Sequence, residues 1–426
     1  MKLEADKQPV KQIDAGAHPS ISLQRPEFLK NIYRSDVKIG GFLSVLIMSG
    51  IAMGLYKGIQ DNYLAEIVRI EPFERGILEF FRELPGFLVV FFLAWMYRFT
   101  DNKIFKIGIA LMIAGVMGFV LLHPGKIAIT AMLIIYSAGE HILMPVRTSI
   151  SLNLAEKDKG GVSLGITSAL GHAGNIAGFL LVSAAFVLFS KTSLQKVYQF
   201  KTIFAFSAAL ITGAFLVSFA IKDSGQTIKR RRFYFARKFL KYYMLEIFYG
   251  SRKQIFMTFA PYVLILNYGA STSAISLLLA FSAVFSFIAS PLIGKIIDMA
   301  GYKIVMVSDT LILIVVCFFY GFAHRLFPMH IAFYVVCVNY VLDAIISVAS
   351  MASNVYVQDI ASNQEEITAT VSTGISVNHV ISIFIALMGG LIWKLAGIEL
   401  LFSISAFLGL CNTLYAASIK KPAQKG

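Results

Sequence analysis

Long apolar segments alternate with short polar ones along almost the whole chain. A helix of about 20 apolar residues crosses the roughly 30 Å hydrocarbon core of a bilayer, and in lipid the backbone polar groups must be satisfied within helices. The pattern therefore predicts an all-α integral membrane protein with about twelve transmembrane helices. Their apolar centres lie in residues 41–55 and beyond, 87–96, 107–122, 127–144, 164–189, 203–221, 255–266, 275–293, 304–322, 329–349, 371–395 and 400–417.

The longest interior polar stretch divides these segments into two halves of about six spans. The predicted organisation is a basic tail (1–38), a first half (39–221), a basic connector (222–253), a second half (254–419) and a short tail (420–426). Residues 232–248 mix Lys and Arg with Phe, Tyr and Leu, which predicts a helix lying on the membrane surface. A mobile linker is the alternative.

Composition and charge agree with a membrane protein. Hydrophobic residues make up 57% of the 426 residues and charged residues 15%, and the mean hydropathy is +0.72, so a soluble domain is excluded. The net charge of +14 comes mainly from the tail and the connector. Because cytoplasmic loops carry an excess of Lys and Arg, we expect both termini and the connector in the cytoplasm, with lipid rather than nucleic acid as the partner of these charges.

The sequence carries no motif of an enzyme. It has no Walker-type phosphate loop, no Gly-x-Ser-x-Gly elbow and no His-Glu-x-x-His zinc site,. Cys317, Cys337 and Cys411 all lie within apolar segments and are typical of small core residues. We therefore expect neither enzymatic activity nor a cofactor, metal or disulfide. The absence of an Asn-x-Ser/Thr sequon favours a bacterial protein, hence the inner cell membrane.

One loop carries a family signature. The chain reads Gly294-Lys-Ile-Ile-Asp298-Met-Ala-Gly301-Tyr-Lys303, which resembles the loop motif of the major facilitator superfamily. The corresponding first-half stretch, residues 94–103, keeps only the basic end. The resemblance implies two six-helix bundles related by a pseudo-two-fold axis, with a central cavity between them. A monomer is expected, although the sequence does not determine the oligomeric state. It also implies that Gly294, Asp298, Gly301 and Lys303 bias the conformational equilibrium.

Ionisable residues near the middle of apolar segments are costly in a bilayer and are functional candidates. Glu140 and Asp343 lie in the fourth and tenth segments, and His172 and His379 lie in the fifth and eleventh. Each half thus offers an acid and an imidazole at similar depth. Such groups can take up a proton on one side and release it on the other, so we predict proton coupling here. The alternative for each histidine is a hydrogen-bonded packing role.

Further polar residues are candidates for binding the substrate. Glu79 and Arg82 share a helix face, so Arg82 either forms a structural ion pair, attracts an anionic substrate or tunes Glu83. Arg147 resembles a residue that many members of the superfamily use for proton coupling, and glycines at 171, 174 and 178 predict close helix packing. The full set of candidate substrate-binding residues is Arg82, Glu83, Asn175, Asn339, Asn378 and Asp61.

These observations predict a secondary transporter that moves a small molecule by alternating access, coupled to protons. The substrate is either an amphiphile or drug that is exported or an organic anion that is imported. The alternative is a non-transporting solute sensor or lipid-handling protein on the same fold. Buried acids and histidines argue against this alternative, because a scaffold gains nothing from their cost.

Overall fold

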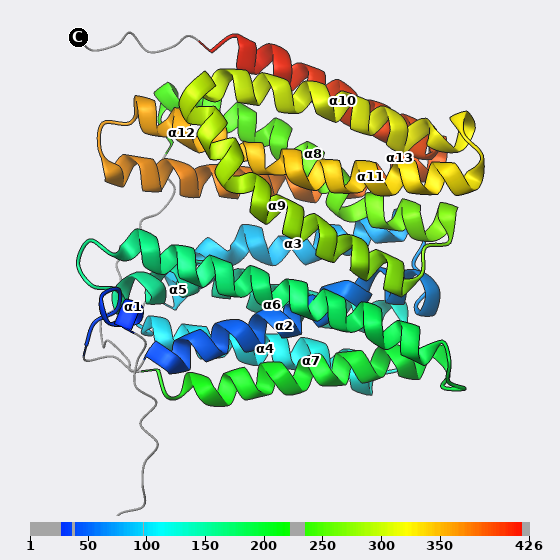
Figure 1. The fold of residues 1–426 in the computed structure, drawn as a ribbon, viewed down its shortest axis with the longest axis horizontal. Helices are drawn as coiled ribbons and strands as arrows, with labels where there is room; N and C mark the ends of the chain where they lie inside the picture. The colour runs from blue at the N-terminus through cyan, green and yellow to red at the C-terminus, as the bar shows by residue number, and fades with distance from the viewer. Residues whose placement is uncertain (1–26, 36–38, 97, 222–234, 420–426) are drawn as a thin grey trace, which may run out of the picture.

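The computed structural model describes residues 27–35, 39–96, 98–221 and 235–419 (Figure 1). These residues are helical apart from short loops, and the one β-bridge among them joins Tyr33 to Ala155. The expected helical class is therefore confirmed. The long helices within each half of the chain run alternately in opposite directions (Figure 1).

The first set of helices follows a short helix, α1 (Glu27–Lys30). Its long members are α2 (Ile39–Asn62), which continues as a π-helical turn over Tyr63–Ile67, α3 (Pro72–Trp95), α4 (Asp101–Leu121), α5 (Lys126–Leu154), α6 (Gly160–Phe189) and α7 (Lys196–Ser218).

The second set follows a 3-10 turn at Arg237–Phe239. It comprises α8 (Leu240–Tyr268), α9 (Thr272–Ala300), α10 (Tyr302–Leu326), α11 (Met329–Ser347), a 3-10 turn at Val348–Ser350, α12 (Met351–Ile360) and α13 (Gln364–Ala417). α13 consists of two helices that meet at Gly397, whose φ of 83° lies in a region that glycine adopts without steric cost.

Nine helices in the described ranges are long and apolar enough to cross a membrane, so the chain is a multi-pass membrane protein. α3 and α8 are not among the nine, although both are long enough. α3 carries Arg75, Glu79 and Glu83, and α8 carries Glu246 and Arg252, all of them buried. The polar groups on these two helices are therefore enclosed by other helices.

Glycines bring α2 and α6 into close contact, as the glycine pattern predicted. A Cβ on Gly178 would lie 2.4 Å from the carbonyl oxygen of Ile51 and 2.7 Å from the Cα of Gly54. A Cβ on Gly50 would lie 2.9 Å from the carbonyl oxygen of Gly171. Only glycine allows the two backbones to approach this closely.

The two sets of helices lie side by side, with α3 and α9 between the rest (Figure 1), and α3 packs on α13 while α6 packs on α9. We call the end where α2 stops at Asn62 the far end, and the end where α8 begins at Leu240 the connector end. At the far end, Ser276 donates a hydrogen bond of 2.6 Å to the carbonyl of Gly58, and Asn62 donates one of 3.0 Å to the carbonyl of Ala270. The sets are thus joined firmly at the far end.

The start of the second set differs from the prediction. Residues 222–234 lie outside the described residues, but α8 begins at Leu240, so the expected boundary at 253/254 and most of the expected surface helix fall inside a packed helix. Glu246 accepts a hydrogen bond from Ser353, and Arg252 pairs with Asp309. The charged residues that suggest a connector have partners on other helices.

Candidate functional site

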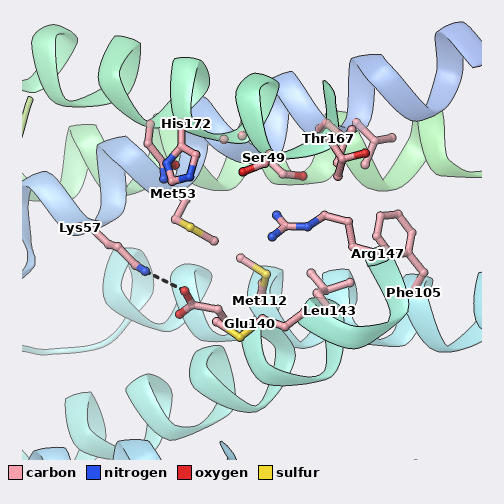
Figure 2. Close-up of a pocket in the computed structure, with 17 residues that line it drawn as sticks. Ser49, Met53, Lys57, Phe105, Met112, Glu140, Leu143, Arg147, Thr167 and His172 are labelled. Carbon is pink, nitrogen blue, oxygen red and sulfur yellow. Dashed lines mark hydrogen bonds and ion pairs between the residues drawn. The ribbon is translucent and has the colours of Figure 1, made fainter. Parts of the chain in front are cut away.

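A cavity of about 200 Å³ lies among α2, α4, α5 and α6 (Figure 2). Its apolar lining includes Met53, Met112 and Leu143 (Figure 2). Its polar and charged lining consists of Ser49, Lys57, Glu140, Arg147, Thr167, Ser168, His172 and Asn175. The cavity lies within the first set of helices, so three of the predicted site residues, Glu140, His172 and Asn175, share it.

Glu140 is neutralised by a lysine on a neighbouring helix. Nζ of Lys57 on α2 donates a hydrogen bond of 2.7 Å to Oε1 of the buried Glu140 on α5 (Figure 2). Lys57 was not among the residues predicted from the sequence, although a lysine inside the first apolar segment is a detectable signal. The ion pair makes this side of the cavity electrically neutral.

Arg147 is the remaining cationic side chain of the cavity. It is half-buried, and its guanidinium group extends into the space between α5 and α6 (Figure 2). The described part of the chain supplies neither a hydrogen bond nor an ion pair to this group. Across the cavity, Oδ1 of Asn175 is buried and has no hydrogen-bond partner. The cavity thus presents an uncompensated positive charge and an unsatisfied acceptor.

An ion-pair network on α3 occupies several other predicted site residues. Arg75 pairs with Glu79 at 2.6 Å and with Asp61 at 3.1 Å. Nε of Arg82 donates to Glu79 at 2.9 Å, and the same guanidinium also pairs with Glu83. The pairing of Arg82 with Glu79 is therefore confirmed. In this arrangement Asp61, Arg82 and Glu83 bind protein groups.

Glu83 also meets two histidines. Nδ1 of His379 on α13 donates to Oε2 of Glu83 at 2.9 Å, and the rings of His379 and His141 lie 5.1 Å apart at 73°. Ligand atoms of Glu83, His141 and His379 all lie within 4.8 Å of one another, which makes this the group of described residues able to hold a metal ion.

In the second set, one arginine lies between two acids. Arg252 on α8 pairs with Asp309 on α10 at 3.1 Å and with Asp343 on α11 at 3.4 Å. The predicted substrate residues nearby bind protein groups as well. Asn339 donates to the carbonyl of Val335 in its own helix, and Asn378 donates to Glu246.

The acid and the histidine that lie at similar depth in each half therefore do not bind each other in this arrangement. Glu140 binds Lys57 rather than His172, whose side chain is exposed at the cavity. Asp343 binds Arg252, and His379 binds Glu83. Position along a helix determines depth, but the rotation and neighbours of each helix determine which side chains meet.

The family motif forms the turn between α9 and α10. Gly301 has a φ of 86°, which favours glycine, and a Cβ on Gly294 would meet nothing within 4 Å. Lys303 donates to the carbonyl of Ile419 at 3.0 Å, whereas Asp298 is exposed. In the first set, Asn102 likewise donates to the carbonyl of Ile221 at 3.3 Å.

No protein-family model matches the sequence. A search of curated proteins also found no match. Solved structures do resemble the chain. The nucleoside transporter NupG superposes with a TM-score of 0.70 at 12% identity, covering 89% of this chain and 98% of that one. A D-xylose–proton symporter superposes with 0.70 at 13% identity, covering 90% and 98%.

A bacterial homologue of the iron transporter ferroportin, in an inward-facing state, superposes with a TM-score of 0.71 at 12% identity, covering 89% of this chain and 98% of that one. All three similar proteins are transporters rather than enzymes. The chain therefore has the major facilitator fold, as the motif around Gly294 predicted.

Proposed function

We propose that the protein is a secondary transporter that moves a small organic anion by alternating access, with twelve spanning helices in two six-helix halves. The transporter fold and the membrane-spanning helices support this proposal. The division of α13 at Gly397 supports the number of spans. The matching hydrogen bonds of Asn102 to Ile221 and of Lys303 to Ile419 support the repeat.

The observation that carries the substrate class is the uncompensated guanidinium of Arg147 in the cavity. A buried charge without a partner is costly, and an anionic group would compensate it through charge-assisted hydrogen bonds. The pair of Lys57 and Glu140 adds no net charge beside it. The unsatisfied oxygen of Asn175 favours a substrate that also carries a hydrogen-bond donor.

The apolar lining fits the rest of such a solute. Met53, Met112 and Leu143 form an apolar surface in the cavity. A short hydrocarbon portion of the substrate can be buried against this surface. Among the described residues, Glu140 is the acid that lines the cavity, and it is already paired with Lys57. The excess positive charge disfavours the cationic amphiphiles that an exporter of drugs would bind. Of the two substrate classes that the sequence left open, the cavity favours the organic anion.

Alternating access requires a closed end and an open end. Hydrogen bonds from Ser276 and Asn62 close the far end, and the cavity extends to Phe105 and Thr167, which lie in the early turns of α4 and α6. We place the opening at the connector end. The basic residues of the tail and connector support a cytoplasmic location for this end, and we propose that the protein lies in the cell membrane.

Proton coupling is assigned to the acids around Arg252. Two carboxylates, Asp309 and Asp343, share this one guanidinium, so the cluster carries one negative charge in excess. A buried excess carboxylate binds a proton more readily than a solvated one. Asp343 therefore retains its predicted role, whereas Lys57 already compensates the charge of Glu140.

Uptake into proteoliposomes tests the proposal. A panel of small carboxylates and their uncharged amides should be offered with and without an imposed pH gradient. We expect at least one carboxylate to accumulate with the gradient, its amide not to accumulate, and Arg147→Gln to abolish accumulation.

Arg325→Gln is the matched control, because Arg325 lies at the exposed end of α10 and pairs with Glu399. Equal accumulation of amide and carboxylate, unchanged in Arg147→Gln, would contradict the substrate class. Binding of a carboxylate without any accumulation would favour a solute sensor.

A further inference from the structure

Three metal-ligating side chains from three helices converge outside the cavity. They are Glu83 on α3, His141 on α5 and His379 on α13, and their ligand atoms lie within 4.8 Å of one another. We propose that these residues form a binding site for a divalent transition-metal ion of the Zn²⁺ type. The proposal is independent of the transported substrate.

The orientation of His141 favours metal binding. Its Nδ1 lies 2.8 Å from the carbonyl oxygen of Ser137. A carbonyl oxygen only accepts hydrogen bonds, so Nδ1 carries the hydrogen and Nε2 presents its lone pair. Histidines that bind metals almost always donate their other ring N–H in this way, which holds the tautomer and the ring orientation.

Gly86 provides the space for the ion. A Cβ at this position would lie 2.6 Å from Nε2 of His141 and 3.0 Å from Nδ1 of His379. The two ring nitrogens therefore border the volume that a side chain at residue 86 would fill. Oε2 of Glu83, at 2.9 Å from Nδ1 of His379, lies on the same side of that ring.

The net charge around Glu83, His141 and His379 is also compatible with a bound cation. Arg82 pairs with the other oxygen of Glu83, Oε1, and with Glu79, whereas Oε2 accepts the hydrogen bond from Nδ1 of His379. A bound metal ion would replace the hydrogen on Nδ1, which passes to solvent, and take both atoms as ligands. In the whole α3 network, two guanidinium groups face the three carboxylates of Asp61, Glu79 and Glu83. The partly buried Lys253 on α8 also interacts electrostatically with Glu83, which weakens the attraction of the group for a cation.

The chemistry of the three ligands indicates which class of metal ion the site would bind. Two imidazoles and one carboxylate suit Zn²⁺ and the divalent ions from Fe²⁺ to Cu²⁺, whereas Mg²⁺ and Ca²⁺ prefer oxygen ligands throughout. Because α3 and α5 belong to the first set of helices and α13 to the second, a bound ion would connect the two sets at mid-depth. The ion would thereby stabilise the arrangement that is closed at the far end.

Cobalt absorption spectroscopy tests the site. The full-length protein, purified in detergent with its affinity tag removed, is titrated with Co²⁺, and the visible d–d bands are recorded. We expect one Co²⁺ per chain, displaced by Zn²⁺. His141→Gln, His379→Gln and Glu83→Gln should each weaken binding about tenfold or more, since even outer-shell partners contribute 10–100-fold.

Two further variants test whether Co²⁺ binds at these three residues and not elsewhere on the protein. Gly86→Ala keeps all three ligands but fills the space between the rings, so it should also weaken Co²⁺ binding. His330→Gln, at the exposed start of α11, is the matched control and should bind Co²⁺ as the unmodified protein does. Size-exclusion profiles and circular dichroism identify any variant that has lost its fold.

X-ray absorption of the unmodified protein loaded with Zn²⁺ needs no variant, and scattering from two imidazole rings is the expected result. Absence of Co²⁺ binding, or binding that persists when both His141 and His379 are replaced, would overturn the proposal. The same conclusion follows if His330→Gln weakens binding as much as His379→Gln. In each case the contact of His379 with Glu83 is an ion pair or hydrogen bond only.

Discussion

Gln254 on α8 donates a hydrogen bond of 3.1 Å to Oε1 of Glu79 on α3, and this bond joins the two sets of helices at mid-depth. The same carboxylate accepts hydrogen bonds from Arg75 and Arg82. Glu79 therefore compensates the buried guanidinium of Arg75 and the partly buried one of Arg82 while it bonds to α8. The arrangement of α3 relative to its neighbours depends strongly on this one side chain.

Replacing Glu79 should destabilise the protein severely. Glu79→Gln removes the shared acid and leaves the buried Arg75 and the partly buried Arg82 with one carboxylate partner each. Breaking a buried ion pair in this way costs about 3–5 kcal/mol. Thermal unfolding in detergent measures the loss.

Glu74→Gln is the matched control on the same helix. Glu74 pairs with Lys126 at an exposed position, and such surface pairs contribute at most about 1 kcal/mol. Equal shifts of Tm for the two variants would contradict the role assigned to Glu79.

Close packing of α2 on α6 should not tolerate a methyl group. Gly178→Ala places a Cβ 2.4 Å from the carbonyl oxygen of Ile51, and overpacking of this kind costs about 1–3 kcal/mol. Gly165→Ala, on the same helix, meets nothing within 4 Å and should stabilise the helix by about 0.5–1 kcal/mol. Tm values of the two variants should move in opposite directions, and a shift in the same direction would disprove the packing argument.

Neutralising Asp343 should uncouple transport from the pH gradient. Asp343→Asn leaves Arg252 paired with Asp309 alone and removes the excess negative charge, so gradient-driven accumulation should be lost while exchange and binding persist. Glu140→Gln should instead free Lys57 in the cavity and lower the KM for an anion. Uptake and exchange in proteoliposomes distinguish the two effects. Accumulation by Asp343→Asn with unchanged pH dependence would refute the assignment.

The loop motif should affect turnover more than affinity. Asp298 is exposed in this arrangement, so we expect its carboxylate to find a partner only when the connector end closes. Asp298→Asn should therefore slow transport several-fold with little change in substrate affinity. Initial rates and binding isotherms measure the two quantities. Lys295→Gln, at an exposed neighbour outside the motif, should leave both unchanged, and an unaltered rate in Asp298→Asn would make the motif match coincidental.

The proposed topology predicts opposite accessibility of two sites. Single cysteines in place of Lys229, which lies outside the described residues, and Lys196, at the start of α7 on the far end, should react with an impermeant thiol reagent from opposite sides of the membrane. Intact cells and inverted vesicles provide the comparison. Labelling of both positions from outside would contradict the proposed topology.

The sequence by itself determined the helical membrane architecture, the fold family and the depth of the ionisable residues. Segment length and apolarity are local properties set by the thickness of the bilayer, and the Gly294 to Lys303 motif is a local turn that requires a positive φ at Gly301. Glycine spacing likewise predicted the contact of α6 with α2. The start of α8 was missed, because Glu246 and Arg252 look like loop residues until their partners are known.

Only the tertiary structure decided which side chains meet. His379 and Glu83 are 296 residues apart, and Lys57 and Glu140 are 83 apart, so neither pair follows from the periodicity of one helix. Depth is counted along a helix, but lateral neighbours depend on the rotation and packing of many helices at once. For this reason the sequence named Glu140, Asp343, His172 and His379 as candidates, whereas the cavity at Arg147 and the group of Glu83, His141 and His379 emerged only from the packed helices.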